Sequence, residues 1–217
     1  MVKSEIVSFT TLKNEDDDND EETEYVYVDL GLTSGTLWAE HNVGALFPEG
    51  QGDFFAWGEI ETKKEYTSDN CSSYHKDLGN IAGNPMFDAA TANWGDDWRM
   101  PTLEEVEELV KECIFQRYTL NGTRGYMVTN KSVPSDTIFI PLTGYKDFGN
   151  FRLYPATMGY YWTSTLVGDE ISGIDSIDPN GKLVEKAKAM LFTGSNTPIV
   201  DFIKRNIGCT IRPVSNR

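Results

Sequence analysis

The sequence is poor in the residues and motifs on which many enzyme active sites depend. It contains two histidines, His41 and His75, and no HExxH motif, so a catalytic zinc site is not expected. There is no P-loop and no GxGxxG, and the serine in GLTSG (31–35) lacks the GxSxG spacing of a hydrolase nucleophile. We therefore expect no cofactor and no metal ion, and a protein that is not an enzyme.

Cysteines and long apolar runs are also scarce. Cys71, Cys113 and Cys209 lie far apart and form no CxxC, so the sequence is compatible with one disulfide or with none. No stretch approaches the roughly 20 apolar residues needed to cross a bilayer, so membrane insertion is not expected. Residues 1–22 contain no apolar signal-peptide core. A processed fragment, a cytoplasmic protein and a virion component released by lysis all remain open.

Basic residues are outnumbered, with 19 Lys and Arg against 34 Asp and Glu and a net charge of −15. Residues 1–24 hold nine of these acids and two lysines, which predicts a flexible acidic tether ahead of a domain at 25–217. Because acidic surfaces repel phosphate backbones, no nucleic-acid partner is expected. Asp16, Asp18 and Asp20 have calcium-loop spacing, but Glu21 and Tyr27 stand where Gly and a bidentate Glu are needed.

What the sequence does contain is a series of short strand-like runs. They are rich in β-branched and aromatic residues and are separated by Gly, Pro, Asn and Asp. Together with one or two helices, they predict an α+β domain. The predicted strands span residues 25–30, 36–43, 53–57, 125–130, 137–142, 160–165, 188–192, 198–203 and 209–214.

One helix is predicted after Pro101. Thr102 is a suitable N-cap and Glu105 follows three residues later, which is the pattern of a capping box. The apolar stripe of this helix is formed by Leu103, Val106, Leu109, Val110 and Cys113, and its acids point outward. A second, weaker helical pattern covers residues 85–92.

The tryptophans are expected to form the frame of the domain, because buried indole rings contribute large apolar areas. These residues are Trp38, Trp57, Trp94, Trp98 and Trp162. Arg99, between Trp98 and Met100, is expected to be partly buried and to pair with Asp96, Glu59 or Glu105. An alternative is a carbohydrate-active enzyme that uses a carboxylate pair, for which the candidates are Asp53, Glu59, Asp96 and Asp97.

Six motifs, in order, resemble the Fibrobacter succinogenes major paralogous domain family. They are YVDLGLTSGTLWAEHNVGA, GDFFAWGE, AATANWGDDWRMPT, IFIPLTGY, GYYWTST and IRPV, and the resemblance covers roughly residues 25–214. It implies a compact C-type-lectin-like domain, similar to formylglycine-generating enzymes. It also implies display on the surface of a Bacteroidetes-type bacterium or its phage, with a cell-surface protein or a glycan as the ligand.

The chemistry of the similar families is not carried over. Formylglycine-generating enzymes hold copper with two nearby late cysteines, whereas this chain has only Cys209 in that region. DPN (178–180) is similar to the Glu-Pro-Asn calcium motif of C-type lectins, but it runs into Gly181 and favours a β-turn. We therefore expect adhesion or ligand binding, with attachment to a larger assembly through the N-terminal arm.

Residues 163–206 depart from the pattern of the family between two matching motifs, which suggests a variable binding face. Similar folds are the display proteins of diversity-generating retroelements, so this role is a hypothesis for the chain. Ordinary loop and edge-strand residues, and a structural virion subunit, are the alternatives. The candidate ligand-binding residues are Asp169, Glu170, Asp175, Asn196, Asp201, Phe202, Arg205 and Asn206.

Overall fold

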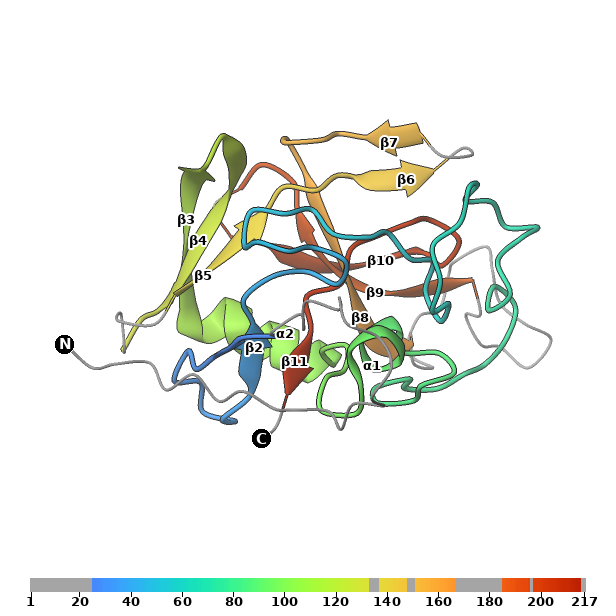
Figure 1. The fold of residues 1–217 in the computed structure, drawn as a ribbon, viewed down its shortest axis with the longest axis horizontal. Coiled ribbons are helices and arrows are strands. Elements are labelled where there is room, and N and C mark those ends of the chain that lie inside the picture. Colours follow the sequence, from blue (N-terminus) through green and yellow to red (C-terminus); the bar gives the residue numbers. More distant parts are fainter. Residues whose placement is uncertain (1–24, 133–136, 148–150, 167–184, 196, 216–217) are drawn as a thin grey trace, which may run out of the picture.

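A computed structural model describes residues 25–132, 137–147, 151–166, 185–195 and 197–215. The predicted tether at 1–24 lies outside these ranges. Within them the chain forms short strands and two helices (Figure 1), in the order β1 (Tyr27–Val28), β2 (Leu37–Ala39), α1 (Ala89–Trp94), α2 (Leu103–Glu112), β3 (Cys113–Leu120), β4 (Thr123–Asn130), β5 (Thr137–Pro141), β6 (Tyr145–Asp147), β7 (Phe151–Leu153), β8 (Gly159–Leu166), β9 (Lys186–Phe192), β10 (Ile199–Lys204) and β11 (Val214–Ser215).

The strands pair in small antiparallel sheets, which confirms the α+β class. The described sheets have the orders β1-β2-β11, β10-β9-β8 and β3-β4-β5, and β6 and β7 form a hairpin. In Figure 1 both helices lie in the lower half of the molecule and the β6–β7 hairpin lies at its top, with β8 running from one level to the other. Neither helix has the length and apolarity of a membrane span, and the described ranges contain no other helix.

Strands β8 and β9 separate two large apolar clusters. Tyr161, Met190 and Phe192 face a cluster formed with α2 and the β3–β5 sheet. Trp162 and Leu191, one residue away, face the other cluster, formed with α1 and residues 207–211. Since successive strand residues point to opposite faces, one sheet serves both clusters. The sheet therefore lies at the centre of the domain.

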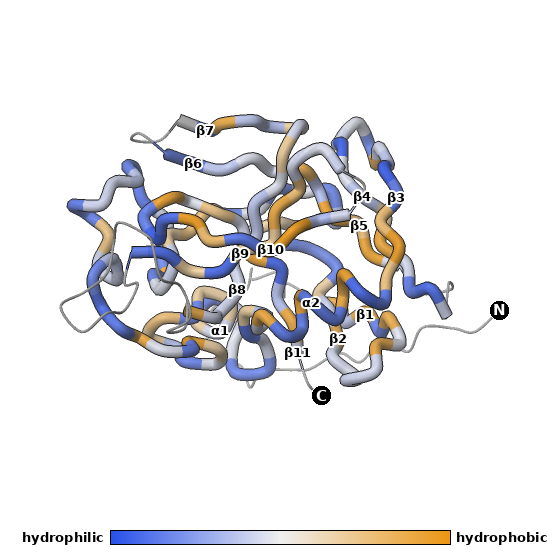
Figure 2. Tube along the Cα trace, turned by 180° about the vertical axis from the view of Figure 1, so that it is seen from behind, coloured by the Kyte–Doolittle hydropathy of each residue, from blue (hydrophilic) through white to orange (hydrophobic). Residues whose placement is uncertain are grey.

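The capping box predicted for the longer helix is confirmed. Thr102 Oγ1 accepts from the backbone of Glu105, and the Glu105 side chain accepts from the backbone of Thr102. Hydrophobic and hydrophilic residues alternate along α2, as expected for one buried face (Figure 2). The helix stops before Cys113, however, which is the first residue of β3. The weaker helix begins at Ala89 rather than at residue 85, because Asp88 caps it.

Several predicted strands are shorter than expected. Residues 53–57 and 209–214 are mainly irregular, joined by an isolated bridge between Phe55 and Cys209, and only Val214 enters β11. Residues 36–43 contribute only the three residues of β2. Single backbone hydrogen bonds, such as those between Phe55 and Cys209, together with side-chain donors such as Trp162 Nε1 to the Phe55 carbonyl, hold these segments in place of a continuous ladder. Strands β3, β6 and β7 were not predicted.

The segment between β2 and α1 is long and irregular, and it ends on a buried carboxylate. One oxygen of Asp88, which is fully buried, accepts from the backbone of Ala90 and Thr91 at 2.9 and 3.2 Å. The other accepts from the backbone of Gly83 and Met100, both at 2.9 Å. The carboxylate thus joins the loop, α1 and the turn before α2.

We predict that Asp88→Asn lowers the free energy of unfolding by about 3 kcal/mol. The amide would turn a donor toward two buried N–H groups and leave them without an acceptor. Urea unfolding measures the change. Asp96→Asn, in an exposed turn, is the matched control and should cost less than about 0.5 kcal/mol. Equal stability of the two variants would contradict this account.

Candidate functional site

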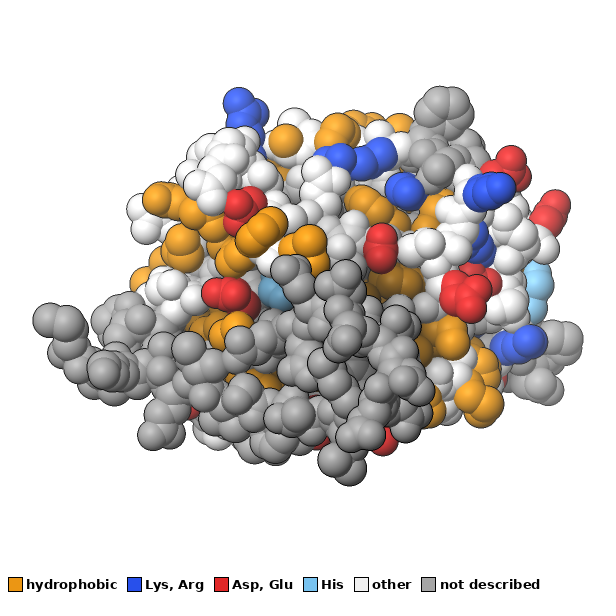
Figure 3. Space-filling model, in the orientation of Figure 1, with side chains coloured by type: hydrophobic (Ala, Val, Ile, Leu, Met, Phe, Trp, Pro, Cys, Tyr) orange, Lys and Arg blue, Asp and Glu red, His pale blue; other side chains and the backbone are white. Residues whose placement is uncertain are grey.

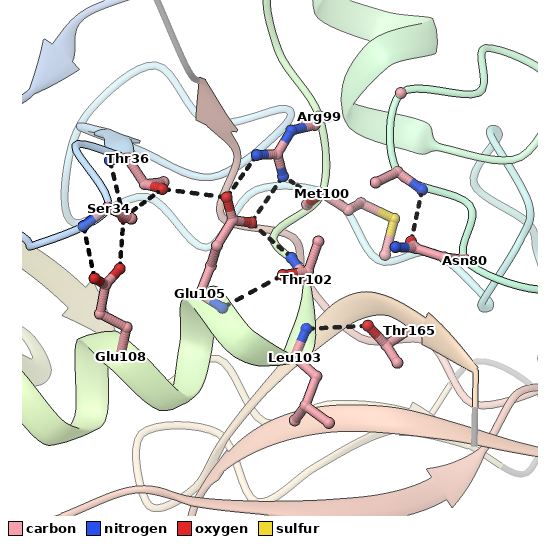
Figure 4. A network of polar contacts seen from close by, with 12 residues as sticks. Ser34, Thr36, Asn80, Arg99, Met100, Thr102, Leu103, Glu105, Glu108 and Thr165 are labelled. Carbon is pink, nitrogen blue, oxygen red and sulfur yellow. Dashed lines mark hydrogen bonds and ion pairs between the residues drawn. The ribbon is translucent and has the colours of Figure 1, made fainter. Parts of the chain in front are cut away.

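The turn before α2 is held by contacts around Glu105 (Figure 4). Arg99 donates two hydrogen bonds to this carboxylate, at 2.7 and 2.5 Å. Thr36 Oγ1 donates to it at 3.2 Å and the backbone of Thr102 at 2.8 Å. Burial alone would raise the pKa of Glu105, but these bonds outweigh it and hold the pKa below its ordinary value. Of the three predicted partners of Arg99, Glu105 is confirmed. The ion pair stabilises the fold by joining the turn at Arg99 to the start of α2.

The GLTSG loop docks onto α2 through acids that the sequence assigned to solvent. Thr33 donates its backbone N–H and its hydroxyl to Glu112, at 3.0 and 2.8 Å. Ser34 does the same with Glu108, at 2.8 and 2.6 Å. Ser34 thus fixes a turn, in keeping with its lack of a nucleophile motif.

Four of the five tryptophans are buried, as expected for a frame: Trp38, Trp57, Trp98 and Trp162. Trp94 is only half-buried. Its ring stacks on Tyr25 with centroids 4.0 Å apart, while Trp98 stacks on Tyr27 at 4.2 Å. The two rings therefore hold the start of the described chain against the body of the domain.

The acids considered for catalysis serve local structure or lie at the surface. Glu59 forms an ion pair with Lys63 at 2.6 Å and accepts from the backbone of Ser72 at 2.6 Å. The residues Asp53, Asp96 and Asp97 are exposed. Among the described residues, no three His, Cys, Asp or Glu side chains gather as metal ligands.

The three cysteines are free and buried, so the structure has no disulfide between them. Burial raises the pKa of each thiol, to about 11 for Cys113 and well above the ordinary value for Cys209. A thiol that stays protonated is a poor nucleophile and a poor metal ligand. The cysteines are therefore packing residues.

The predicted ligand-binding residues fall into three groups. Asp169, Glu170, Asp175 and Asn196 lie outside the described residues, as does DPN (178–180). Asp201 and Phe202 lie on β10, with Asp201 exposed and Phe202 half-buried. The side chains of Arg205 and Asn206 are buried, at 0% and 6% exposure, so the expectation that they face outward is wrong.

Arg205 is buried because it binds backbone carbonyls. Its Nη1 donates to the carbonyls of Ser73 and Lys76, at 2.7 and 2.5 Å, and its guanidinium lies 4.6 Å from the centroid of the Trp57 ring. Burial lowers its pKa to about 10, so it stays protonated at neutral pH. The sequence shows no acid next to Arg205, and we therefore expected it at the surface. Backbone carbonyls, which no sequence motif reveals, are its hydrogen-bond partners.

Strand β10 is the edge strand of its sheet, with Phe202 and its partner Lys188 on one face and Ile199 and Asp201 on the other. Lys188 Nζ on β9 lies 3.5 Å from the centroid of the Phe202 ring. Ile199 is 47% exposed. The backbone N–H of Phe202 bonds the Asp201 carboxylate at 2.7 Å instead of a further strand. Lys188 was not predicted, although its position opposite Phe202 follows from the β9–β10 register.

Comparisons of the chain with protein-family models, with curated proteins and with solved structures gave no match. The likeness to the paralogous domain family therefore rests on the six sequence motifs. The function of the β9–β10 surface is therefore inferred from the side chains that it presents.

We predict that Glu105→Gln lowers the free energy of unfolding by about 2 kcal/mol at pH 7, because it leaves the partly buried Arg99 without its charged partner. A carboxylate whose folded pKa is depressed stabilises the fold above its unfolded pKa, about 4.3. That stability is lost as the pH falls through the folded pKa. Urea titrations from pH 7 to pH 3 should therefore show the difference shrinking below about pH 4. A difference in unfolding free energy between the wild type and Glu105→Gln that stays constant with pH would contradict this prediction. Glu104→Gln, at the exposed neighbouring position, is the control.

We predict that Arg205→Met lowers the free energy of unfolding by about 3 kcal/mol, since the buried carbonyl of Ser73 and the partly buried carbonyl of Lys76 lose their donor. Lys204→Met removes the neighbouring exposed charge and should change it by less than about 0.5 kcal/mol. Chemical denaturation followed by tryptophan fluorescence compares the two. If Arg205→Met unfolds like the wild type, the guanidinium is not a structural clamp.

Proposed function

We propose that this domain is a non-catalytic recognition module, displayed on the surface of a Bacteroidetes-type bacterium or its phage. Its ligand is a cell-surface protein or a glycan. The single observation that carries the proposal is the edge strand β10, where Phe202 packs against Lys188 on one face and Asp201 and the exposed Ile199 lie on the other. Aromatic side chains with neighbouring charges are typical anchors of interfaces.

The rigid frame supports this proposal. A binding surface that is fixed before the ligand arrives loses less conformational entropy on binding. Lys188 is held in place by the Phe202 ring and by the nearby charges of Asp201 and Glu107, which oppose the lowering of its pKa by burial. The surface is therefore arranged in the absence of ligand.

The finer parts of the proposal rest on the family resemblance. The C-type-lectin-like fold fits the observed small antiparallel sheets and two helices. A role as the variable display protein of a diversity-generating retroelement fits the departure of residues 163–206 from the family pattern. A near-copy of the terminal coding stretch, altered only at adenines and beside a reverse transcriptase gene, is the genomic sign to seek.

The alternatives are a carbohydrate-active enzyme and a structural virion subunit. For the enzyme, Glu59 and the buried Asp88 are already occupied by local hydrogen bonds. For the virion subunit, no contact among the described residues favours assembly over ligand binding. We therefore propose neither.

We predict that Phe202→Ala and Ile199→Ala weaken binding to the best-bound component of a printed glycan panel, or to intact gut Bacteroidetes cells, at least about tenfold. The reason is loss of the apolar anchors on β10. Biolayer interferometry measures the affinities.

Ile114→Ala is the matched control, because Ile114 is 55% exposed on β3, which belongs to another sheet. Equal loss in Ile114→Ala and Ile199→Ala would show that the effect is not local to β10. Unchanged binding by Phe202→Ala, or turnover of a glycan by the purified protein, would overturn the proposal.

A further inference from the structure

The inner face of the β3–β5 sheet changes from apolar to cationic toward the β3–β4 turn. Phe115, Val128 and Ile138 are paired in register and belong to the core. Two pairs further along β3, the same face presents Arg117 and then Thr119, opposite Tyr126 and Arg124. Because side chains alternate along a strand, these residues share one face. Diagonal neighbours on a sheet face lie about 7 Å apart, so the two arginines are within reach of one ligand.

These residues line a pocket of about 470 Å³, within the range of small-molecule sites. Leu142 supplies an apolar wall, and Ala156 and Thr157 close the other side. None of its eight lining residues is acidic, although the chain carries −15 overall. In Figure 3, Lys and Arg side chains are visible near the tip of β3–β4 and over the region of the β6–β7 hairpin. The local charge is therefore opposite to the net charge.

Most of the hydrogen-bonding capacity of the two arginines is unused. Arg117 donates one bond, to the carbonyl of Gly194, and its guanidinium lies 5.9 Å from the Tyr126 ring centroid. Arg124 is exposed and makes no side-chain hydrogen bond or ion pair in the described part of the chain. A guanidinium has five N–H donors and binds carboxylates in pairs of parallel bonds. The donors left over point to an oxyanion.

The opposite wall of the pocket is rigid. Tyr154 and Ala156 have positive φ values of 53° and 58°, a strained conformation for residues other than glycine. The turn is held because Ala156 N donates to the carbonyl of Leu142 at 3.0 Å and Thr157 Oγ1 to that of Tyr154 at 3.0 Å. The Thr157 side chain is thereby fixed beside the arginines.

We propose that this pocket binds the carboxylate of an acidic sugar residue of the hexuronate class. The guanidinium groups of Arg117 and Arg124 bind the carboxylate. The hydroxyls of Thr119 and Thr157 face the sugar hydroxyls, and Leu142 packs against the ring carbons. This site is separate from the β10 surface and does not depend on the function proposed for it.

The pocket chemistry favours a sugar acid over other anions. A nucleotide would require an aromatic ring for its base, but Tyr118, which also lines the pocket, faces the other side of the sheet and packs edge-on against Phe139. A simple inorganic anion would leave the threonine hydroxyls and the Leu142 wall unused. The lining of the open pocket is more apolar than polar, and it also includes two arginines and two threonines. This mixture suits a sugar ring, which has apolar carbons on its faces and hydroxyl groups at its edge.

Isothermal titration of the full chain with trigalacturonic acid tests the proposal. Arg124→Gln should weaken binding at least about tenfold, since a charge-assisted hydrogen bond is lost. It should leave the melting temperature unchanged, because Arg124 makes no contact that the fold needs. Lys64→Gln removes an equal charge from an exposed site outside the pocket and should bind within about twofold of the wild type. Binding should also weaken between 50 and 300 mM salt, concentrations at which charges are increasingly screened.

Three further titrations make the result decisive. The neutral sugar maltotriose should not bind, and sulfate should compete only weakly. Ile199→Ala should bind trigalacturonic acid normally, whereas loss of binding in that variant would place the site on β10. No binding by the wild type, full binding by Arg124→Gln, or equal affinity for sulfate and the sugar acid would each overturn the assignment.

Discussion

The structure depends on buried side-chain donors that bond backbone carbonyls, both in irregular segments and in its short strands. A buried carbonyl without a donor is costly, and much of this chain is buried without belonging to a long strand or helix. Arg212 donates to the carbonyl of Glu40, just after β2, and to those of Ala39 in β2 and Phe139 in β5. Arg205 does the same for the loop at 73–76. The indole N–H groups of Trp57 and Trp162 bond the backbone of Thr163 and Phe55. Two arginines and two tryptophans thus supply hydrogen bonds to interior backbone carbonyls, a role that strand pairing has in larger sheets.

This constraint separates the frame from the surfaces that remain free to bind. Burial lowers the pKa of Arg212 to about 10, as it does for Arg205, yet both stay charged and are committed to the interior. The arginines at the end of β3–β4 are less committed. Arg117 gives one bond, to the carbonyl of Gly194, and the side chain of Arg124 gives none within the described residues. Arginine therefore stabilises the fold at positions 205 and 212 and is available to bind a ligand at positions 117 and 124. The number of backbone carbonyls around each guanidinium distinguishes these two roles.

The sequence predicted the parts of the fold that local chemistry determines. Thr102 and Glu105 defined the start of α2, and the alternating runs near 160 and 188 defined β8 and β9. Arg205 was misplaced because the carbonyls bound by its Nη1, those of Ser73 and Lys76, are more than 120 positions away, which no local pattern reveals. Strand β3 was missed because it follows α2 without a turn. A usable signal was present: Asn121-Gly122 is a strong hairpin dipeptide, and pairing its flanks would have placed Arg117, Thr119 and Arg124 on one face.

Native-state hydrogen exchange of the unmodified protein tests the central claim most directly. If buried donors hold the irregular segments as firmly as strands, the amides of Asp53, Phe55 and Trp57, which bond the backbone of Val43, Cys209 and Arg205, will exchange as slowly as that of Val128 in β4, the strand that pairs with both β3 and β5. Slow exchange at all four positions is the predicted result. Exchange at residues 53–57 at the rate of an open loop, while Val128 stays protected, would contradict the account.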